Sequence, residues 1–460
     1  MSGKERDLTQ GSILGHIRAV AIPAALSLLF VTLYNVTDTF YAGKISTEAQ
    51  AGLGLGSQLF FIIIGTGVGF RIGVSAFVGN AIGAGDRQAA ARAAAQAIGA
   101  SVVVCALAMV AGFWGLPALA RAVGGDNAYV DNAVTYMRLM LLSAPGFIVT
   151  YAMTGTLSAQ GDTVTQERAQ LAATLANVGL NPLFIWGIPG VFDGFGLNGI
   201  ALSTILCQSG VLLFIGWSAF RSDVLRDIAW RDLLPRWGKQ KDLMRNVIPA
   251  CSTIYVTVLG GVIAQFFLRP YGADAVAAYG VGFRLQQLLL LPVIGLTTAL
   301  LPLTAQNIGA EKQDRIREAV GLTAMAGCVF VALGAVVIWT MGEPLVRLFN
   351  DDDAVVAHAV MFLQILSFGL PFLVLIFVSQ NLLQGLERPN WPLLIGVWRL
   401  GIGLALFGWL FTGPMGLEVR GVWLALLAGG VTGAVLAAII TLRVARGAGL
   451  NLLRPADQNH

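Results

Sequence analysis

Asp38 is the one acidic residue that lies clearly inside a long apolar stretch of the sequence. A carboxylate at membrane depth is expensive to keep there, and such residues usually serve transport or proton transfer. Because a carboxylate so placed can exchange a proton, Asp38 is a candidate for ion exchange. The alternative is an aspartate that simply contacts water near the outer end of the first span.

Two asparagines and three arginines are the other polar residues of interest inside apolar stretches. Asn177 and Asn181 are four residues apart, so they share one face of a helix. Their amide oxygens can ligate a cation or form hydrogen bonds with a carboxylate, although the pair can equally hold two helices together. A buried arginine must pair or face water, and backbone carbonyls, lipid head groups and substrate remain open as partners. These arginines are Arg71, Arg284 and Arg399.

Several other kinds of chemistry are excluded. The histidines, His16, His358 and His460, are far apart and form no metal-binding pattern. No Gly-rich loop is followed by Lys-Ser or Lys-Thr, so the sequence predicts neither ATP hydrolysis nor a bound cofactor. An integral membrane enzyme would need clustered acids, histidines or a nucleophile next to a base, and none is visible. We therefore expect no enzyme.

The composition indicates which elements hold these residues, because the chain is 56% hydrophobic and only 12% charged. About 20 apolar residues suffice for a helix to cross the hydrocarbon core, and we predict an all-α integral membrane protein with twelve transmembrane helices in two pseudo-symmetric six-helix lobes. The predicted spans are Ile17–Tyr41, Ala49–Ala84, Ala93–Ala120, Asp131–Gly161, Ala169–Phe192, Gly194–Phe220, Asn246–Leu268, Ala275–Ala310, Ala319–Gly342, Ala354–Leu386, Pro389–Leu417 and Gly421–Leu442.

The distribution of lysine and arginine predicts the orientation of the spans. With the N-terminus inside, 20 of these residues fall in cytoplasmic segments and five in outer loops, as the positive-inside rule requires. We therefore expect both termini in the cytoplasm of a cell whose inner (plasma) membrane holds the chain. The net charge of +4 is spread over short loops, so we expect no nucleic-acid partner.

An internal repeat relates the two halves of the chain. A shift of 226 residues aligns Ile22–Ala24 with Ile248–Ala250, and keeps Gly54 and Gly56 in register with Gly280 and Gly282. The predicted domains are an N-terminal lobe (1–220), a cytoplasmic linker (221–245) and a C-terminal lobe (246–460). Parallel six-span repeats are typical of transporters that alternate access by rocking; the alternative is a duplicated scaffold with another task.

Three motifs resemble those of the multidrug and toxic compound extrusion (MATE) transporters: Val36–Gly43, Asn80–Gly85 and Gly196–Ala201. The resemblance covers nearly the whole chain. The NorM-like branch of that family has acids in the seventh and tenth spans, and the corresponding segments Asn246–Leu268 and Ala354–Leu386 have none. The chain is therefore most similar to the DinF-like branch, in which coupling chemistry belongs to the N-terminal lobe.

This resemblance implies roles for individual residues. Asp38 stands at the family's coupling site, and protonation of that aspartate is proposed to bend the first helix in DinF-like relatives. The resemblance implies coupling-ion binding by Asp38, Asn177, Asn181 and Thr204, a hinge at Pro23 and a cavity tyrosine at Tyr136. An ordinary proline near the start of a membrane helix is the alternative for Pro23.

The function expected from the resemblance is secondary antiport, with export of a cationic or amphipathic small molecule in exchange for a cation. We favour H⁺ over Na⁺ because some relatives carry an aspartate where Asn181 stands, and one carboxylate supplies little charge for sodium. The expected partners are the small-molecule substrate, the coupling cation and the lipid bilayer, and we expect a monomer. The alternative is a flippase for lipid-linked precursors, a class that often has fourteen spans and a cationic cavity.

Overall fold

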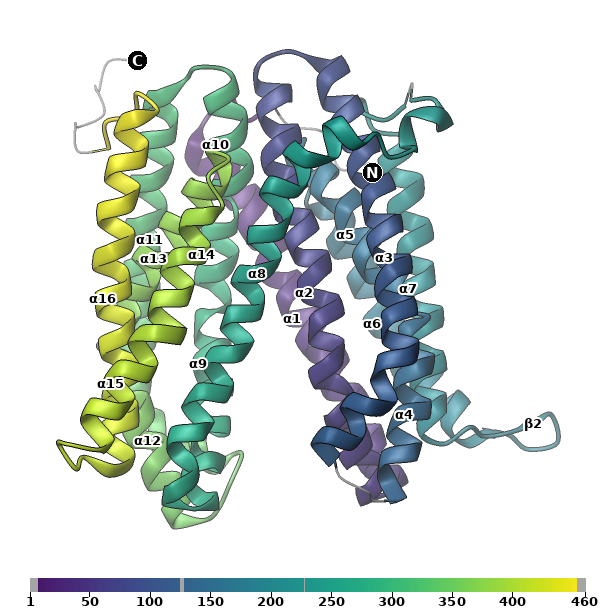
Figure 1. Ribbon diagram of the computed structural model, residues 1–460, viewed down its shortest axis with the longest axis vertical. Helices are drawn as coiled ribbons and strands as arrows, with labels where there is room; N and C mark the ends of the chain where they lie inside the picture. The colour runs from purple at the N-terminus through teal and green to yellow at the C-terminus, as the bar shows by residue number, and fades with distance from the viewer. Residues whose placement is uncertain (1–6, 125–127, 227, 453–460) are drawn as a thin grey trace. The chain divides into compact units, whose positions relative to one another are not determined.

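A computed structural model describes residues 7–124, 128–226 and 228–452 of the chain (Figure 1). Helices make up nearly all of it. The first part contains α1 (Ile13–Ile45), α2 (Thr47–Gly83), α3 (Arg87–Gly124), α4 (Ala128–Leu141), α5 (Ala144–Ala159), α6 (Val164–Trp186), the short strands β1 (Gly187–Ile188) and β2 (Phe192–Asp193), α7 (Leu197–Phe220) and the 3₁₀ turn η1 (Trp230–Leu233).

The second part has the same sequence of long helices with different breaks. It contains α8 (Trp237–Leu268), the turn η2 (Arg269–Tyr271), α9 (Ala273–Thr298), α10 (Leu300–Gly309), α11 (Gln313–Arg347), α12 (Asp353–Ser367), α13 (Leu370–Gly385), α14 (Asn390–Gly396), the π-helical segment η3 (Val397–Ile402), α15 (Gly403–Thr412) and α16 (Glu418–Gly447). Each predicted span therefore corresponds to one helix or to consecutive helices.

Among the described residues, ten helical segments are long and apolar enough to cross a membrane, and the pair α12–α13, bent by 59°, makes an eleventh. The remaining helix, α6, occupies the place of the predicted fifth span but is not one of these. It carries Glu167, Arg168, Asn177 and Asn181, so its polar residues make it less apolar than its neighbours. Asn177 and Asn181 are the two of these residues that the sequence marks for chemistry.

Most helices begin or end a few residues from the approximate predicted limits, and two of the differences change the local structure. The fifth span ends at Trp186, not Phe192, because Gly187 has a φ of +75° and leads into an antiparallel hairpin in which Gly187 pairs with Asp193. Figure 1 shows this hairpin, labelled at β2, extending past the ends of α6 and α7. The seventh span begins at Trp237, so the last part of the predicted linker is helical.

The contacts divide the chain into two compact units, and two helices change unit along their length. Unit 1 contains Leu26–Val247, and unit 2 contains Leu8–Ala25 together with the chain from Ile248 onward. The change falls inside α1 just after Pro23 and inside α8 just before Pro249. Both prolines lie inside their helices and are equivalent in the 226-residue repeat.

The segment before α1 is anchored on unit 2. Leu8 is fully buried, and its backbone N–H donates to Oε1 of Gln306 at 2.9 Å. Its carbonyl accepts from Nδ2 of Asn307 and from Nη2 of Arg315, both at 3.1 Å. The guanidinium group of Arg315 therefore holds the segment before α1 in place. The polar sequence of this segment did not predict that it would be ordered.

Unit 2 has an aromatic core formed by three helices. The ring of Tyr279 on α9 lies nearly parallel to that of Trp423 on α16, with centroids 6.3 Å apart and an interplanar angle of 12°. Phe362 on α12 packs its edge against both rings, at 5.9 and 5.0 Å. Phe362 and Trp423 are fully buried, so this cluster holds α9, α12 and α16 together.

Candidate functional site

Asp38 on α1 is buried, with 8% of its surface exposed, and three neutral side chains donate to its carboxylate. Nδ2 of Asn177 and Nδ2 of Asn181 lie 3.0 and 2.8 Å from Oδ1. The hydroxyl of Thr204 donates to Oδ2 at 3.5 Å. The structure therefore brings together the four residues that the sequence predicted as the ion site.

The two asparagines are placed by α6 and are completely buried. Nδ2 of Asn181 also donates to Oδ1 of Asn177 at 3.2 Å, as expected for residues one helical turn apart. Pro182 follows directly and has no N–H to offer the carbonyl of Val178. The hydroxyl of Tyr41 on α1 donates to that carbonyl instead, at 3.1 Å, which ties α1 to α6 beside the site.

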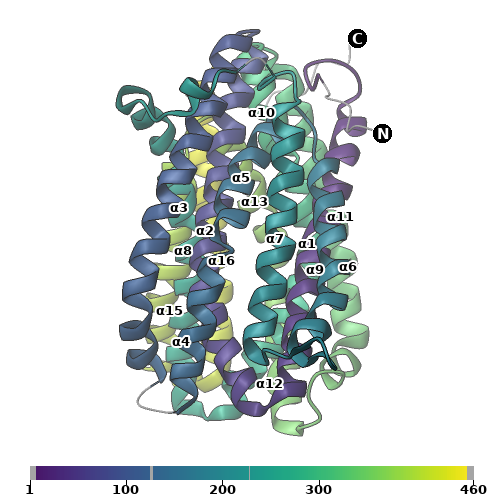
Figure 2. The same ribbon diagram turned by 90° about the vertical axis from the view of Figure 1, so that its right-hand side faces the viewer.

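The third side of the site is α7, which packs along α6 (Figure 2). Thr204 on α7 accepts a hydrogen bond from the hydroxyl of Tyr34 at 3.1 Å. Tyr34 is buried and lies one turn before Asp38 on α1. Ser203 accepts from Nδ2 of Asn177 at 3.5 Å. Sequence reasoning did not place Tyr34 or Ser203 at the site; the four-residue spacing of Tyr34 and Asp38 could have indicated the first.

We call the cluster of Asp38, Asn177, Asn181, Ser203, Thr204 and Tyr34 the Asp38 chamber. It contains one negative charge, that of Asp38, and otherwise neutral dipoles. In the part of the chain that the structure describes, no lysine or arginine forms an ion pair with Asp38. The donors therefore stabilise the ionised carboxylate without a cation locking it in that form. Oδ1 of Asn181 is buried and has no hydrogen-bond partner, so the site also contains an unpaired acceptor.

Two other predicted residues have different positions. Tyr136 on α4 is buried and interacts electrostatically with Asp38, as expected for a residue that lines the same chamber. Pro23 lies inside α1, fifteen residues before Asp38, and belongs to unit 2. Over fifteen residues a straight helix rises about 22 Å, so Pro23 can act on Asp38 only through the helix.

The arginines do not contribute to the Asp38 chamber. Arg71 on α2 interacts electrostatically with Tyr151 on α5 and with Glu167. Glu167 is buried within the first turn of α6, whereas the sequence prediction started that span at Ala169 and so missed this carboxylate; Asp162, just before α6, is also buried. Arg284 on α9 is exposed, and Arg399 lies in η3 of unit 2.

Metal binding finds no support in the described ranges, where no group of three or more histidine, cysteine, aspartate or glutamate side chains could hold a metal ion. The four cysteines are free, three of them buried and Cys328 half-buried. The chemistry available at the site is therefore that of one carboxylate, two amides and three hydroxyl groups.

The chain is similar to known transporters over most of its length. A family model described as MatE matches residues 23–183 and 249–409, two segments related by the same 226-residue shift. The chain is 26% identical to an FAD transporter of Shewanella oneidensis, over 83% of this chain and 84% of that protein. It is 23% identical to a probable multidrug resistance protein NorM of Thermotoga maritima, over 89% and 88%.

Solved structures show the same fold. A transporter of the MOP superfamily from Pyrococcus furiosus superposes with a TM-score of 0.88 at 23% identity, covering 98% of this chain and 99% of that one. A multidrug resistance MATE transporter in an outward-facing conformation gives a TM-score of 0.88 at 23% identity, covering 97% and 99%. These likenesses confirm the predicted two-lobed architecture of twelve helices.

Proposed function

Because the chain belongs to the MatE family of membrane transporters, we propose that it exports amphipathic or cationic small molecules in exchange for protons that bind at Asp38. The observation that carries this proposal is the buried Asp38 carboxylate, held by three neutral donors. The chain is a transporter and not an enzyme. The proposed setting is the plasma membrane, and the proposed transporting unit is the monomer.

The hydrogen bonds around Asp38 suggest how a proton alters the site. An ionised carboxylate only accepts hydrogen bonds, whereas the protonated form also donates one. Protonated Asp38 therefore needs an acceptor, and Oδ1 of Asn181 is buried nearby without a partner. Rotation of the Asn181 amide would present this oxygen to Asp38 and withdraw a donor, so protonation would rearrange the contacts between α1 and α6.

The same geometry favours protons over sodium as the coupling ion. Sodium is a hard cation that needs several oxygen ligands, but both amides direct nitrogen at Oδ1 of Asp38. The oxygen of Asn177 accepts from Asn181, so two amides would have to turn to build a sodium site. One carboxylate also supplies only a single negative charge.

The substrate class rests on the relatives. Their names describe an FAD transporter and multidrug resistance or export proteins, and we carry small organic solutes over to this chain as the substrate class. The flippase alternative is not favoured, because the family and its similar members are efflux transporters. The chamber beside Asp38 also lacks the basic residues expected of a cavity for anionic lipid precursors.

Transport in proteoliposomes tests this proposal. Purified chain is reconstituted, and accumulation of ethidium is measured under an imposed pH gradient or an imposed sodium gradient. We expect the pH gradient alone to drive accumulation, and Asp38→Asn to abolish it because asparagine cannot exchange a proton. Asp86→Asn is the matched control, since Asp86 is exposed and its carboxylate accepts from the backbone N–H of Ala89.

Two results would contradict the proposal. Full gradient-driven accumulation by the Asp38→Asn variant would remove Asp38 from the coupling mechanism. Accumulation by the native chain that persists after both gradients are collapsed would exclude secondary antiport.

A further inference from the structure

Arg399 carries a positive charge at the middle of a membrane-spanning helix in unit 2. It is the tenth residue of the apolar segment Asn390–Thr412, which places it about 14 Å along a helix that rises 1.5 Å per residue. The inward face of this segment is formed by Pro392, Ile395, Gly396 and Gly403, which are buried. Arg399 follows Ile395 and Gly396 by four and three residues, so it lies on that same face.

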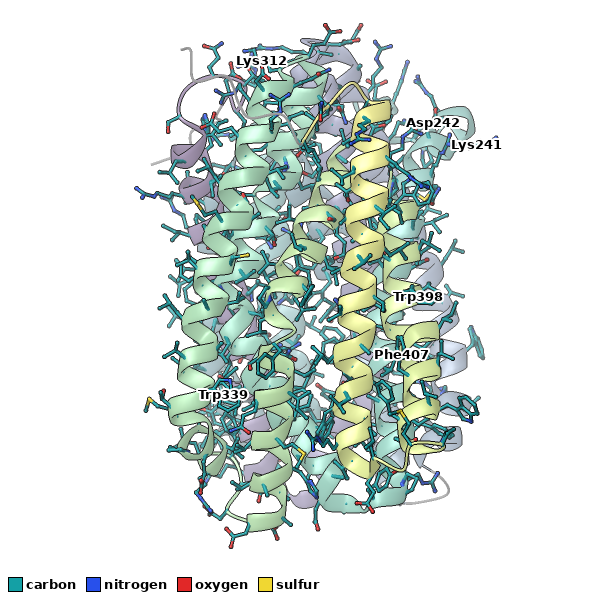
Figure 3. The ribbon with its side chains drawn as sticks, turned by 90° about the vertical axis from the view of Figure 1, so that its left-hand side faces the viewer. Lys241, Asp242, Lys312, Trp339, Trp398 and Phe407 are labelled. Carbon is teal, nitrogen blue, oxygen red and sulfur yellow. The ribbon has the colours of Figure 1, made fainter. Side chains whose placement is uncertain are left out.

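The backbone at Arg399 is unusual. Residues Val397–Ile402 form a π-helical segment, in which the N–H of Gly403 bonds to the carbonyl of Trp398. Segments of this kind are rare and occur frequently at functional sites. Trp398 is fixed by a hydrogen bond from its indole N–H to Thr432 of α16, at 3.1 Å. Figure 3 shows Trp398 and Phe407 along this segment next to α16.

Two glycines of α16 accommodate the arginine. A Cβ at Gly433 would lie 3.1 and 3.2 Å from Cβ and Cγ of Arg399, and a Cβ at Gly429 would lie 2.7 Å from its carbonyl oxygen. The aliphatic part of Arg399 therefore rests against bare backbone, which limits the positions of its guanidinium group. The residue as a whole is half-buried.

The charge of Arg399 is not balanced by a carboxylate. Within the described part of unit 2 it forms no ion pair, and its electrostatic partner is the hydroxyl of Tyr279. The acidic residues on the helices of that unit lie within two turns of a helix end: Asp274, Asp314, Glu318, Glu343, Asp353 and Glu418. An arginine at this depth without a counter-ion needs water or an anionic ligand.

One aromatic pair includes the electrostatic partner of Arg399. Tyr279 belongs to the core with Phe362 and Trp423, and it also stacks on Phe283, with centroids 5.7 Å apart and an angle of 27°. Phe283 is 36% exposed, so part of this pair is accessible. A planar guanidinium binds carboxylate or phosphate through paired hydrogen bonds, and exposed rings stack on flat ligands.

In the internal repeat, the helix that carries Arg399 is equivalent to α6, the polar helix of the first lobe. The 226-residue shift aligns Arg399 with Ala173 of α6, one turn before Asn177. The equivalent helices of the two repeats therefore both carry polar groups. In the first lobe these are the two asparagines that donate to Asp38, and in the second lobe the group is Arg399.

We propose that Arg399 is the anion-recognising residue of a binding site within the second lobe, for a solute that carries a carboxylate or phosphate next to an aromatic ring. The proposal rests on the proposed transport function, since it names one class of substrate. The guanidinium group holds the oxyanion, and Tyr279 and Phe283 contact the ring.

Equilibrium binding to the purified full-length chain in detergent tests the site. The probes are 2-naphthoate, 2-naphthyl phosphate and the neutral 2-naphthamide, measured by isothermal titration calorimetry. We expect both anions to bind at least about tenfold more tightly than the amide, because a hydrogen bond to a charged group is worth a factor of this size. Arg399→Gln should remove that preference and leave amide binding unchanged.

Arg284→Gln is the matched control, because Arg284 lies on α9 of the same unit and is exposed; it should keep the preference. Arg399→Lys retains the positive charge but lacks the planar guanidinium group. This variant is used if Arg399→Gln does not elute as a single species from a size-exclusion column. It should bind the anions several-fold more weakly than the native chain. Equal affinity for anion and amide in the native chain, or undiminished anion binding in either Arg399 variant, would overturn the proposal.

The assay separates this inference from the proposed antiport. Binding in detergent involves no ion gradient, so the anion preference is measured even if Asp38 has no coupling role. Asp38→Asn should bind 2-naphthoate as the native chain does. If that variant loses coupled transport while Arg399→Gln keeps its anion preference, the antiport stands and the Arg399 site falls.

Discussion

Asp38 illustrates how a costly group is kept at membrane depth. Its burial disfavours the charge, and two amides and a hydroxyl offset that cost without introducing an opposite charge. A lysine or arginine in the same place would stabilise the ionised form so strongly that proton exchange would be lost. In the proposed mechanism, the neutral donors are therefore the feature that would let Asp38 exchange a proton.

Asn181 should control the choice of ion. Asn181→Asp adds a second carboxylate beside Asp38 and replaces a donor at 2.8 Å with oxygens that can bind a hard cation. We expect an imposed sodium gradient to drive ethidium accumulation in this variant, at a rate at least threefold above the native chain. Asn181→Ser is the control, because it shortens the side chain without adding charge. A variant that remains indifferent to sodium would contradict the assignment of Asn181 to the ion site.

The sequence predicted most of this site but not all of it. Asn177, Asn181 and Thr204 were connected to Asp38 through the family resemblance, since no spacing rule places residues of three helices together. Tyr34 and Ser203 act through Thr204 and Asn177, and such indirect contacts depend on how the helices are rotated. Glu167 was missed because the polar residues around it resemble a loop.

At the scale of elements, α1 combines the site and the proposed hinge. It is one continuous helix from Ile13 to Ile45 with Pro23 inside it. Proline cannot donate to the carbonyl of Ala19, so the helix lacks one bond at that point. Asp38 belongs to unit 1 and Pro23 to unit 2, so a bend near Pro23 would change the direction of the half that carries Asp38.

Pro23→Ala should therefore slow transport while leaving the ion site intact. Alanine restores the missing hydrogen bond and favours a straight helix, and we expect a roughly tenfold lower rate, equivalent to about 1.4 kcal/mol in the barrier. The measurement is the initial rate of ethidium uptake under a pH gradient. Pro117→Ala is the control, since Pro117 lies inside α3, which stays within unit 1. Equal rates for native chain and Pro23→Ala would argue against the hinge.

Close packing between α5 and α7 depends on a glycine. A Cβ at Gly146 would lie 2.6 Å from Cβ and 2.8 Å from the carbonyl oxygen of Gln208, so Gly146→Ala forces the two helices apart. We expect destabilisation of about 1–3 kcal/mol, typical of overpacking, measured as a lower unfolding temperature in detergent. Gly210→Ala on α7 faces open space and should be neutral or slightly stabilising. Similar melting of both variants would show that the contact is unimportant.

The elements themselves were largely predictable, because long apolar runs leave few alternatives in a membrane. The exceptions have local causes. Pro145 and Pro371 stand in the first turns of α5 and α13, and they accompany breaks that divide single apolar runs into two helices. The π-helical segment at Arg399 has no sequence signature of its own, since its other residues are as apolar as those of an ordinary membrane helix.

At the scale of the whole molecule, the repeat predicted two similar lobes, but the chemistry in them differs. The family model matches both repeats, yet Asp38 aligns with Ala264 and Asn177 with Gly403. The scaffold is therefore duplicated, whereas Asp38 has no carboxylate at the equivalent position of the second lobe, and Arg399 has no arginine at the equivalent Ala173 of the first.

The orientation of the chain in the membrane can be tested from its own loops. Val191 in the hairpin is 74% exposed, and the side chain of Asp314, at the start of α11, is 81% exposed. The excess of lysine and arginine in the cytoplasmic segments predicts that the hairpin is outside and Asp314 inside. In intact cells, a membrane-impermeant maleimide should label Val191→Cys fully, and should label Asp314→Cys only after permeabilisation. The native chain gives the background, because three of its cysteines are buried and Cys328 is half-buried. Labelling of Asp314→Cys in intact cells would reverse the assigned topology, and it would place the anchored segment at Leu8 outside the cell.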